Sequence, residues 1–295
     1  MQGMITVFWK ELADHFTSWR FIILFAIVFA VGIFAIYIDA QYIREAVSKT
    51  HFVFLQLYTT SGQALPLFIF FFSFFLPIIG IALGFDAINS EKNSGTLSRL
   101  LSQPIFRDAV INGKFLAGVV TIAIMLVSIV MLVAGVGLWM IGVPPSAEEV
   151  GRLMAFLAVS IVYGAFWLGL GILFSIFFQR VATSALASIA VWIFFASLLL
   201  LPGFIQAEYG QTGFIIMRVS PITLFQEAVS VLLIPEVRTL GFITESVSAW
   251  MLPNPLSFGQ SLLVVWPHLV SLLALTVVCF AISYIRFMRE EIRST

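Results

Sequence analysis

Long runs of apolar residues alternate with short polar stretches along most of this chain. A helix needs about 20 apolar residues to cross the hydrocarbon core of a bilayer, so each long run predicts one membrane-spanning helix. The expected spans are residues 21–38, 64–85, 115–141, 153–178, 181–201 and 263–286. We therefore expect an all-α membrane protein with six transmembrane helices, in which residues 1–295 form a single transmembrane domain.

The residues before the first span have a different pattern. Between residues 4 and 20, apolar residues recur at steps of three and four, whereas Lys10 and Glu11 fall on other faces of the helix. Trp9 and Trp19 stand beside these charges, which is typical of a helix that lies in the membrane interface. The alternative interpretation is that this segment forms the first turns of a long first span.

The composition supports the membrane assignment. Hydrophobic residues make up 61% of the chain and charged residues only 10%, whereas about 25% of a soluble domain is charged. The charges are too few to cover a soluble globule, but they are enough to fill the loops between spans. The formal net charge of zero argues against a nucleic-acid partner, which needs a basic surface. This composition fits a protein that is surrounded by membrane lipid.

The basic residues predict the orientation of the chain. One side of the membrane would hold Lys10, Arg20, Lys92, Arg99, Arg107, Lys114, Arg180, Arg286, Arg289 and Arg293, and the other Arg44, Lys49, Arg152, Arg218 and Arg238. Because basic residues concentrate in cytoplasmic loops, the distribution of ten against five predicts that both termini are cytoplasmic. The protein is then a multi-pass protein of the plasma (inner) membrane, with residues 204–262 as an extracytoplasmic segment.

The expected spans carry no chemistry that would power transport. No ionisable residue lies near the middle of a span, which disfavours an ion-coupled mechanism. No His/Asp/Glu or Ser/His pairing falls within the spans, so we assign no catalytic residue and no metal ligand. The chain also lacks the Gly-x-x-x-x-Gly-Lys-Ser/Thr motif of P-loop proteins. We therefore expect a chain that is not an enzyme and that receives energy from a partner.

The most polar stretch, residues 86–114, carries a recognisable order of residues. Residues 85–107 read FDAINSEKNSGTLSRLLSQPIFR, and Lys114 follows before the next span. The order of Glu-Lys, Gly-Thr-Leu, a leucine pair, a proline and an arginine resembles the first cytoplasmic loop of the ABC-2 family, the membrane subunits of ABC exporters. Leucines on one side of a short helix can seat in a partner's groove, charged residues can flank it, and Pro104 can end it.

This resemblance implies a function and a set of site residues. It implies the ABC-2 exporter-type permease fold, with two such chains, identical or paralogous, forming the translocation path. A separate cytoplasmic ATPase would bind ATP and Mg²⁺, so this chain needs no cofactor of its own. The implied ATPase-coupling residues are Glu91, Lys92, Gly95, Thr96, Leu97, Arg99, Leu100 and Leu101. The second and fifth spans would line the path, and Phe71, Phe72 and Phe75 are candidate gate residues, with packing in the core as the alternative.

The segment after the fifth span carries a second resemblance. Ser220-Pro221 and the amphipathic run after them resemble the permeases that serve nitrous-oxide-reductase maturation and sodium export.

Two other hypotheses for the function also fit the sequence. One is a non-transporting scaffold or sensor that recruits a partner through the same loop, and it would show neither vesicle transport nor substrate-stimulated ATP hydrolysis. The other is an ion-coupled secondary transporter, which would work on a proton gradient without ATP.

Overall fold

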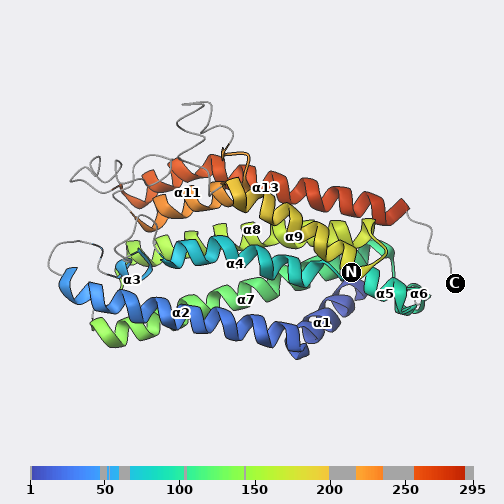
Figure 1. Ribbon diagram of the computed structural model, residues 1–295, viewed down its shortest axis with the longest axis horizontal. Coiled ribbons are helices and arrows are strands. Elements are labelled where there is room, and N and C mark those ends of the chain that lie inside the picture. The colour runs from blue at the N-terminus through green and yellow to red at the C-terminus, as the bar shows by residue number, and fades with distance from the viewer. Residues whose placement is uncertain are drawn as a thin grey trace.

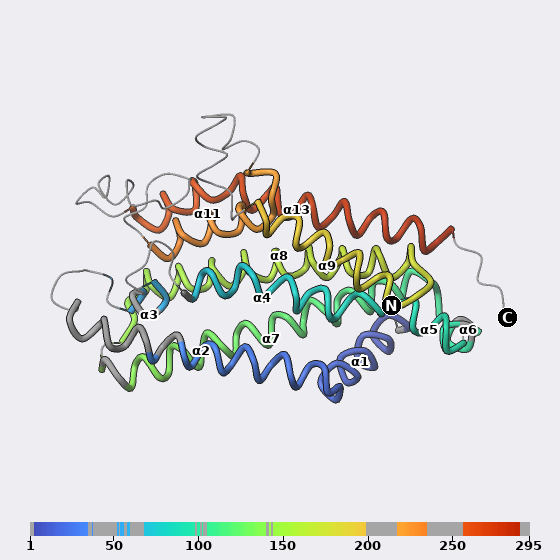
Figure 2. The backbone as a smooth tube through the Cα atoms, viewed as in Figure 1, coloured from blue at the N-terminus to red at the C-terminus, as the bar shows by residue number. Residues whose placement is uncertain are grey.

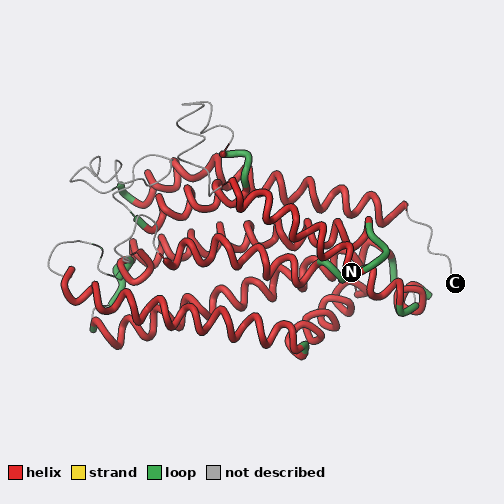
Figure 3. Tube along the Cα trace, viewed as in Figure 1, coloured by secondary structure: helices red, strands yellow, loops and turns green. Residues whose placement is uncertain are grey.

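The computed structural model describes residues 2–46, 52, 54–59, 67–102, 105–142, 144–198, 217–234 and 256–289. These residues form helices α1 (Gln2–Thr17), α2 (Trp19–Ala46), α3 (Gln56–Thr59), α4 (Leu67–Gly84), α5 (Asn89–Asn93), α6 (Thr96–Leu101), α7 (Arg107–Ile141), α8 (Ala147–Phe177), α9 (Val181–Leu198), α11 (Pro221–Leu233) and α13 (Phe258–Arg289). Within the described ranges there is no strand (Figure 3). The all-α fold class is confirmed.

The long helices agree with a multi-pass membrane protein. Among the described residues, five helices are long and apolar enough to cross a membrane: α4, α7, α8, α9 and α13. A sixth span is counted if α1 and the first half of α2 are taken as one broken helix, because they pass the same test together and bend by 64° at Ser18. Figure 2 shows this change of direction between α1 and α2. The bend separates α1 from α2, and a position of α1 in the membrane interface stays a prediction.

Several helices extend beyond the apolar runs that predict them. The third long helix, α7, begins at Arg107 rather than at residue 115, and α8 begins at Ala147 rather than at residue 153. Hydropathy marks only the part of a helix that lies in hydrocarbon, whereas the helix itself ends where its backbone is capped. For α8 the cap is a capping box, in which the Ser146 and Glu149 side chains each bond the other's backbone N–H. Lys114, expected in a loop, therefore lies inside α7.

Helix α8 is the centre of the bundle and packs against α4, α7 and α13. In its most apolar stretch 72% of residues are buried, against 22% in α13 and 17% in α9. Tyr163 of α8 stacks on Phe225 of α11 with ring centroids 4.2 Å apart, and its hydroxyl donates a hydrogen bond to the carbonyl of Ser73 in α4 at 2.8 Å. The weakly buried helices are those that leave most surface for lipid or for another subunit.

Helices α4 and α8 approach each other closely because glycines line their contact. A Cβ atom on Gly80 would lie 2.8 Å from the carbonyl oxygen of Gly164, and one on Gly84 would lie 2.6 Å from that of Leu168. Real Cβ atoms do not come this close to backbone, so only glycine fits at these two positions. Two small residues four positions apart are typical of close packing between membrane helices, and Gly80 and Gly84 have this spacing.

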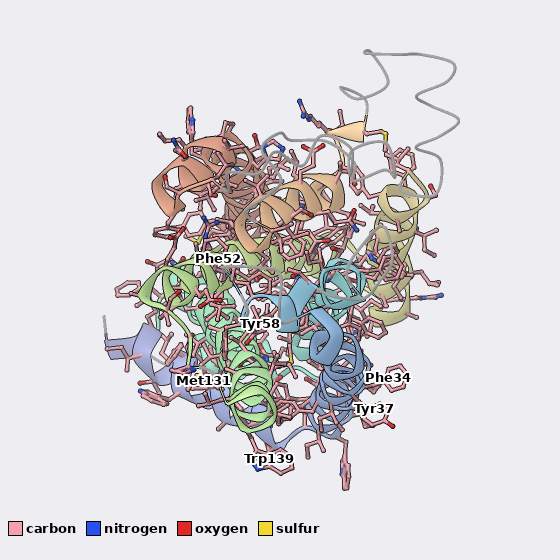
Figure 4. The ribbon with its side chains drawn as sticks, turned by 90° about the vertical axis from the view of Figure 1, so that its left-hand side faces the viewer. Phe34, Tyr37, Phe52, Tyr58, Met131 and Trp139 are labelled. Carbon is pink, nitrogen blue, oxygen red and sulfur yellow. The ribbon has the colours of Figure 1, made fainter. Side chains whose placement is uncertain are left out.

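The two ends of the bundle differ in which segments they gather. Helices α1, α5 and α6, the start of α9 and the last turns of α13 lie at one end, and α3 and the first turns of α8 lie at the other (Figure 1). Figure 4 looks at that second end, where Trp139 projects outward and Tyr58 lies in the interior. Trp139 is 85% exposed, whereas the Tyr58 hydroxyl is buried and donates a hydrogen bond to the carbonyl of Val130 at 3.1 Å. Basic residues belong to several of the segments that lie together at the first end, namely α1, α5, α6 and the last turns of α13.

Candidate functional site

Helices α5 and α6 form a short polar extension at the end of α4. The backbone N–H groups of Ile88 and Asn89 both donate to the Ser175 hydroxyl of α8, at 2.9 and 3.1 Å. The Asn93 side-chain amide donates to the carbonyl of Gln179, in the turn between α8 and α9, at 3.0 Å. These bonds satisfy backbone groups at the start of a five-residue helix that could not form alone. They fix α5 on the end of α8.

Gly95 makes the turn from α5 to α6. Its φ is +70°, in the left-handed region, and its N–H donates to the carbonyl of Lys92 at 3.1 Å. A Cβ atom at this position would meet nothing within 4 Å. Glycine is therefore required for the backbone conformation and not for space, since another residue would cost about 1–2 kcal/mol in this region. The glycine of the Gly-Thr-Leu sequence thus has a structural role in the turn.

The apolar side of α6 packs against its own chain. Leu97 is fully buried in the core, and Leu100 is partly buried against it. This differs from the expectation that the leucines seat in a groove of a partner. A six-residue helix is not stable by itself, so its apolar side is needed to attach it to the bundle. Thr96 and Arg99 are exposed and Lys92 is half-buried, whereas the side chain of Leu101 lies outside the described part of the structure.

Glu91 also contacts its own chain. Its Oε1 lies 3.0 Å from the Lys114 Nζ of α7 and 3.2 Å from the Lys10 Nζ of α1. A third ion pair joins Arg20 of α2 to Asp86, in the turn that leads to α5, and the Arg20 guanidinium lies 5.5 Å from the centroid of the Phe85 ring. The acidic residues around α5 therefore fasten it to the N-terminal helices.

The candidate gate residues lie on α4. Phe71 and Phe72 are buried and Phe75 is partly buried. The ring of Phe71 stacks on that of Phe75 with centroids 4.3 Å apart, whereas Phe72 packs against Phe156 of α8 at 5.8 Å. Phe72 thus takes part in packing between α4 and α8 within the subunit. A gate role for the three residues stays a prediction.

An apolar cavity of about 270 Å³ lies between α4 and α9, the second and fifth of the expected spans. Its lining residues share an apolar character: Ile78, Ile81, Ala82, Phe85, Ala185, Ile189 and Trp192. The indole N–H of Trp192 is buried and has no hydrogen-bond partner within the described part of the chain. Because α9 is barely covered by the rest of the chain, this cavity lies beside the least protected long helix.

A cluster of charged residues around α11, at the opposite end of the bundle, is not predicted from the sequence. Helix α11 is buried along its whole length, and its Glu227 accepts from Arg218 at 3.1 Å and pairs with the His268 Nε2 of α13 at 2.7 Å. Arg152 of α8 is also fully buried. These residues come from separate segments, and the only signal was the charge inside the amphipathic run after Pro221. In the described ranges no group of three His, Cys, Asp or Glu residues could hold a metal ion.

Acidification is expected to loosen α1 from α7. Burial lowers the pKa of His15, whose Nδ1 lies 3.1 Å from the Thr121 hydroxyl of α7. Burial would raise the pKa of Glu11, but Lys114 and Lys10 outweigh it and lower that pKa. The folded protein therefore binds fewer protons than the unfolded chain. The stabilisation is complete above the ordinary pKa values of 6.5 and 4.5 and is lost as the pH falls through the two lowered values.

Hydrogen exchange of α1 in nanodiscs measures this effect. Between about pH 7.5 and about pH 5, exchange corrected for its intrinsic rate should become faster in α1, while that of α8 stays constant. The titration of His15 should account for the change in this range, so the His15→Gln variant should respond much less. An equal response in the variant and the native protein would contradict the assignment.

Comparison with known proteins bears on the whole chain. The family described as ABC-2 family transporter protein matches residues 5–292. A curated protein of Pseudomonas aeruginosa (strain PAO1), named "Probable ABC transporter permease protein NosY", is 26% identical over 199 residues. That alignment covers 65% of this chain and 66% of the relative, just under two thirds of its length. The family match includes both ends of the bundle and the α5–α6 extension.

Proposed function

This chain belongs to the ABC-2 family of transporter proteins, as a membrane subunit without ATPase activity, and from that premise we propose that it forms the translocation path of an ATP-driven exporter. Two copies, or one copy and a paralogue, enclose the path. A separate cytoplasmic ATPase binds ATP and Mg²⁺ and acts on the α5–α6 extension. The observation that supports this proposal most directly is the way in which that extension combines an exposed polar surface with a firm attachment to the bundle.

The end that carries α5 and α6 is assigned to the cytoplasm. Arg99 of α6, Arg180 before α9 and Arg286 and Arg289 of α13 all belong to segments at that end. An excess of basic residues marks the cytoplasmic side of a membrane protein. In this orientation an ATPase reaches α5 and α6 from the cytoplasm, and α11 and its charged cluster lie toward the other side.

The contacts of α5 explain how a displacement would reach the membrane. Helix α5 follows α4 after a short turn, and Ser175 and Gln179 attach it to the end of α8. A force on α5 therefore acts on both helices of the glycine-lined α4–α8 contact. The apolar cavity between α4 and α9 lies on the other side of α4, and it is our candidate for part of the path. Phe71 and Phe75, stacked on α4, are candidates for its gate.

Replacing Arg99 with glutamate is expected to weaken ATPase binding. Arg99 is exposed, so the substitution should leave the fold intact while it reverses the charge on the outer face of α6. We expect at least about a tenfold loss of affinity, which corresponds to about 1.4 kcal/mol. The measurement is binding of the purified cognate ATPase to the variant in nanodiscs, followed by ATP hydrolysis of the complex.

The matched control is Arg289→Glu, which makes the same charge change in an exposed residue at the same end of the bundle. It should leave ATPase binding unchanged. Equal affinities of Arg99→Glu and the native protein would remove α6 from the contact. The scaffold hypothesis makes a different prediction, because a scaffold would bind a partner through α6 without ATP-dependent transport into vesicles.

A further inference from the structure

Lys114 is a buried cation that links three elements. It lies at the start of the third turn of α7, and its side chain is only 4% exposed. Its Nζ is 2.9 Å from the Glu11 Oε1 of α1 and 3.0 Å from the Glu91 Oε1 of α5. The interfacial helix and the proposed ATPase-contacting extension are thus held by the same ammonium group.

Lys10 is a second cation beside the two glutamates that Lys114 contacts. Its Nζ lies 2.8 Å from the Glu11 Oε1 and 3.2 Å from the Glu91 Oε1. Each of the two lysines therefore contacts both glutamates. We call Lys10, Glu11, Glu91 and Lys114 the α1–α5 charge cluster. Ions taken from water need close partners, so removing one member of such a set leaves another with an uncompensated charge.

The charge cluster can rearrange without losing all its bonds. Both lysines bond the Oε1 atom of Glu91, whereas its Oε2 atom is buried and has no hydrogen-bond partner among the described residues. A cavity of about 190 Å³ lies beside the cluster and is lined by all four members together with Asp14 and His15. A small rotation of α5 could exchange one glutamate oxygen for the other on Lys114. Elements with two discrete bonding arrangements are the kind that transmit a displacement.

Other contacts hold α1 in place without involving α5. Helix α1 packs closely on α7, since a Cβ atom on Gly113 would lie 2.9 Å from the Val7 Cγ1. Helix α5 in turn is fastened to α8 through Ser175. Within the described ranges, the ion pairs that join α1 to α5 pass through Glu91, and the Arg20–Asp86 pair joins the next helix to the turn before α5. The charge cluster is therefore placed to couple two elements that are otherwise anchored separately.

We propose that Lys114 is a positioning residue that makes the interfacial helix α1 follow the displacement of α5 when the ATPase changes its nucleotide state. This proposal rests on the proposed function, because it takes α5 and α6 as the segment on which the ATPase acts. It adds that α1 is a moving part of the coupling machinery and not only an anchor on the membrane surface. Lys114 acts through the two glutamates and touches neither nucleotide nor substrate.

The test measures movement of α1 directly. Spin labels are attached at Ala13→Cys in α1 and Arg289→Cys in α13, both exposed positions, in a Cys279→Ser background. Distances are measured for the complex with its ATPase, free of nucleotide and trapped with ADP and vanadate. We expect the α1–α13 distance distribution to shift between the two states in the protein with native Lys114. In Lys114→Met, which keeps a long side chain without the charge, the shift should be lost, and in Lys114→Arg it should return.

Two further variants make the outcome specific. Glu11→Gln breaks the link from Lys114 to α1 and leaves only the Lys10–Glu91 pair, whose lysine is half-exposed and screened by solvent, so this variant should also lose the shift. Asp14→Asn removes an exposed carboxylate that pairs with Lys10 at 3.2 Å, and it should keep the shift. A shift that persists in Lys114→Met or in Glu11→Gln overturns the proposal, as does its loss in Asp14→Asn. ATPase binding to the nucleotide-free complex is measured alongside, since its absence in the native protein would refute the proposed function instead.

Discussion

A Gly84→Val variant is expected to lose its stable folded structure. A Cβ atom at this position would lie 2.6 Å from the carbonyl oxygen of Leu168 and 3.0 Å from the backbone nitrogen of Ile172. Both are backbone atoms of α8, so no side chain can rotate away to make room. The two helices would have to separate. Overpacking typically costs about 1–3 kcal/mol and occasionally more, and we expect the upper end or beyond here because only backbone atoms stand in the way. The α4–α8 contact is at the centre of the bundle, so the loss should spread through the fold.

Thermal unfolding in detergent and size-exclusion chromatography measure this loss. The matched control is Gly135→Val in α7, where a Cβ atom would meet nothing within 4 Å. The control should unfold at nearly the native temperature, because the added methyl groups face open space. Equal melting temperatures of the two variants would show that the α4–α8 contact does not require glycine at position 84.

Arg152→Met is expected to have the second largest effect. Arg152 is fully buried, and its guanidinium donates to the carbonyls of Leu232 in α11 and Leu256 before α13, at 3.1 and 2.5 Å. It also donates to the Ser261 hydroxyl at 3.0 Å and to the Glu148 Oε1 at 2.8 Å. Methionine fills part of the space but leaves these acceptors without their donor. Breaking a buried charged network in this way costs about 3–5 kcal/mol.

The same unfolding measurement applies to Arg152→Met, with Arg180→Met as the control. Arg180 is exposed in the turn before α9, and surface substitutions of this kind change stability by about 0.5 kcal/mol or less. Because Arg152 holds the ends of α11 and α13, the variant should also show faster hydrogen exchange in α11 before global unfolding. Unchanged protection of α11 would mean that the stacking of Phe225 on Tyr163 is enough to hold it.

The hydropathy pattern predicts the long helices because bilayer thickness fixes how many apolar residues a span needs. It fails at helix ends, where polar residues still have helical backbone. Lys114 is the instructive case: a charged residue suggests a loop, yet α7 begins seven residues earlier and buries the lysine between two glutamates. A single sequence contains no signal for this, since Glu11 and Glu91 belong to distant segments.

For the candidate site, too, the sequence predicts one part and not another: it marks the segment but not the contacts of its side chains. The order of residues from Glu91 to Leu101 predicts one short helix, whereas the structure has two, α5 and α6, joined by a turn at Gly95. Which side chains face outward could not be read from that order. The leucines of a short helix can seat in a partner or in their own chain, and only the packing of Leu97 into the core decides between them. The predicted spans carry no central charge, and Glu227 lies outside them, on α11, which is too short to count as a span.

The partners of Arg152 become available at different times as the chain is made. Glu148 lies four residues away on α8, so their ion pair can form as soon as this helix does. Ser261 is synthesised 109 residues after Arg152. A guanidinium that enters the membrane with α8 thus brings its own counter-ion, which lowers the cost of inserting the helix before its later partners exist. Glu148, which is partly exposed in the finished bundle, is thus the first partner that Arg152 has during synthesis.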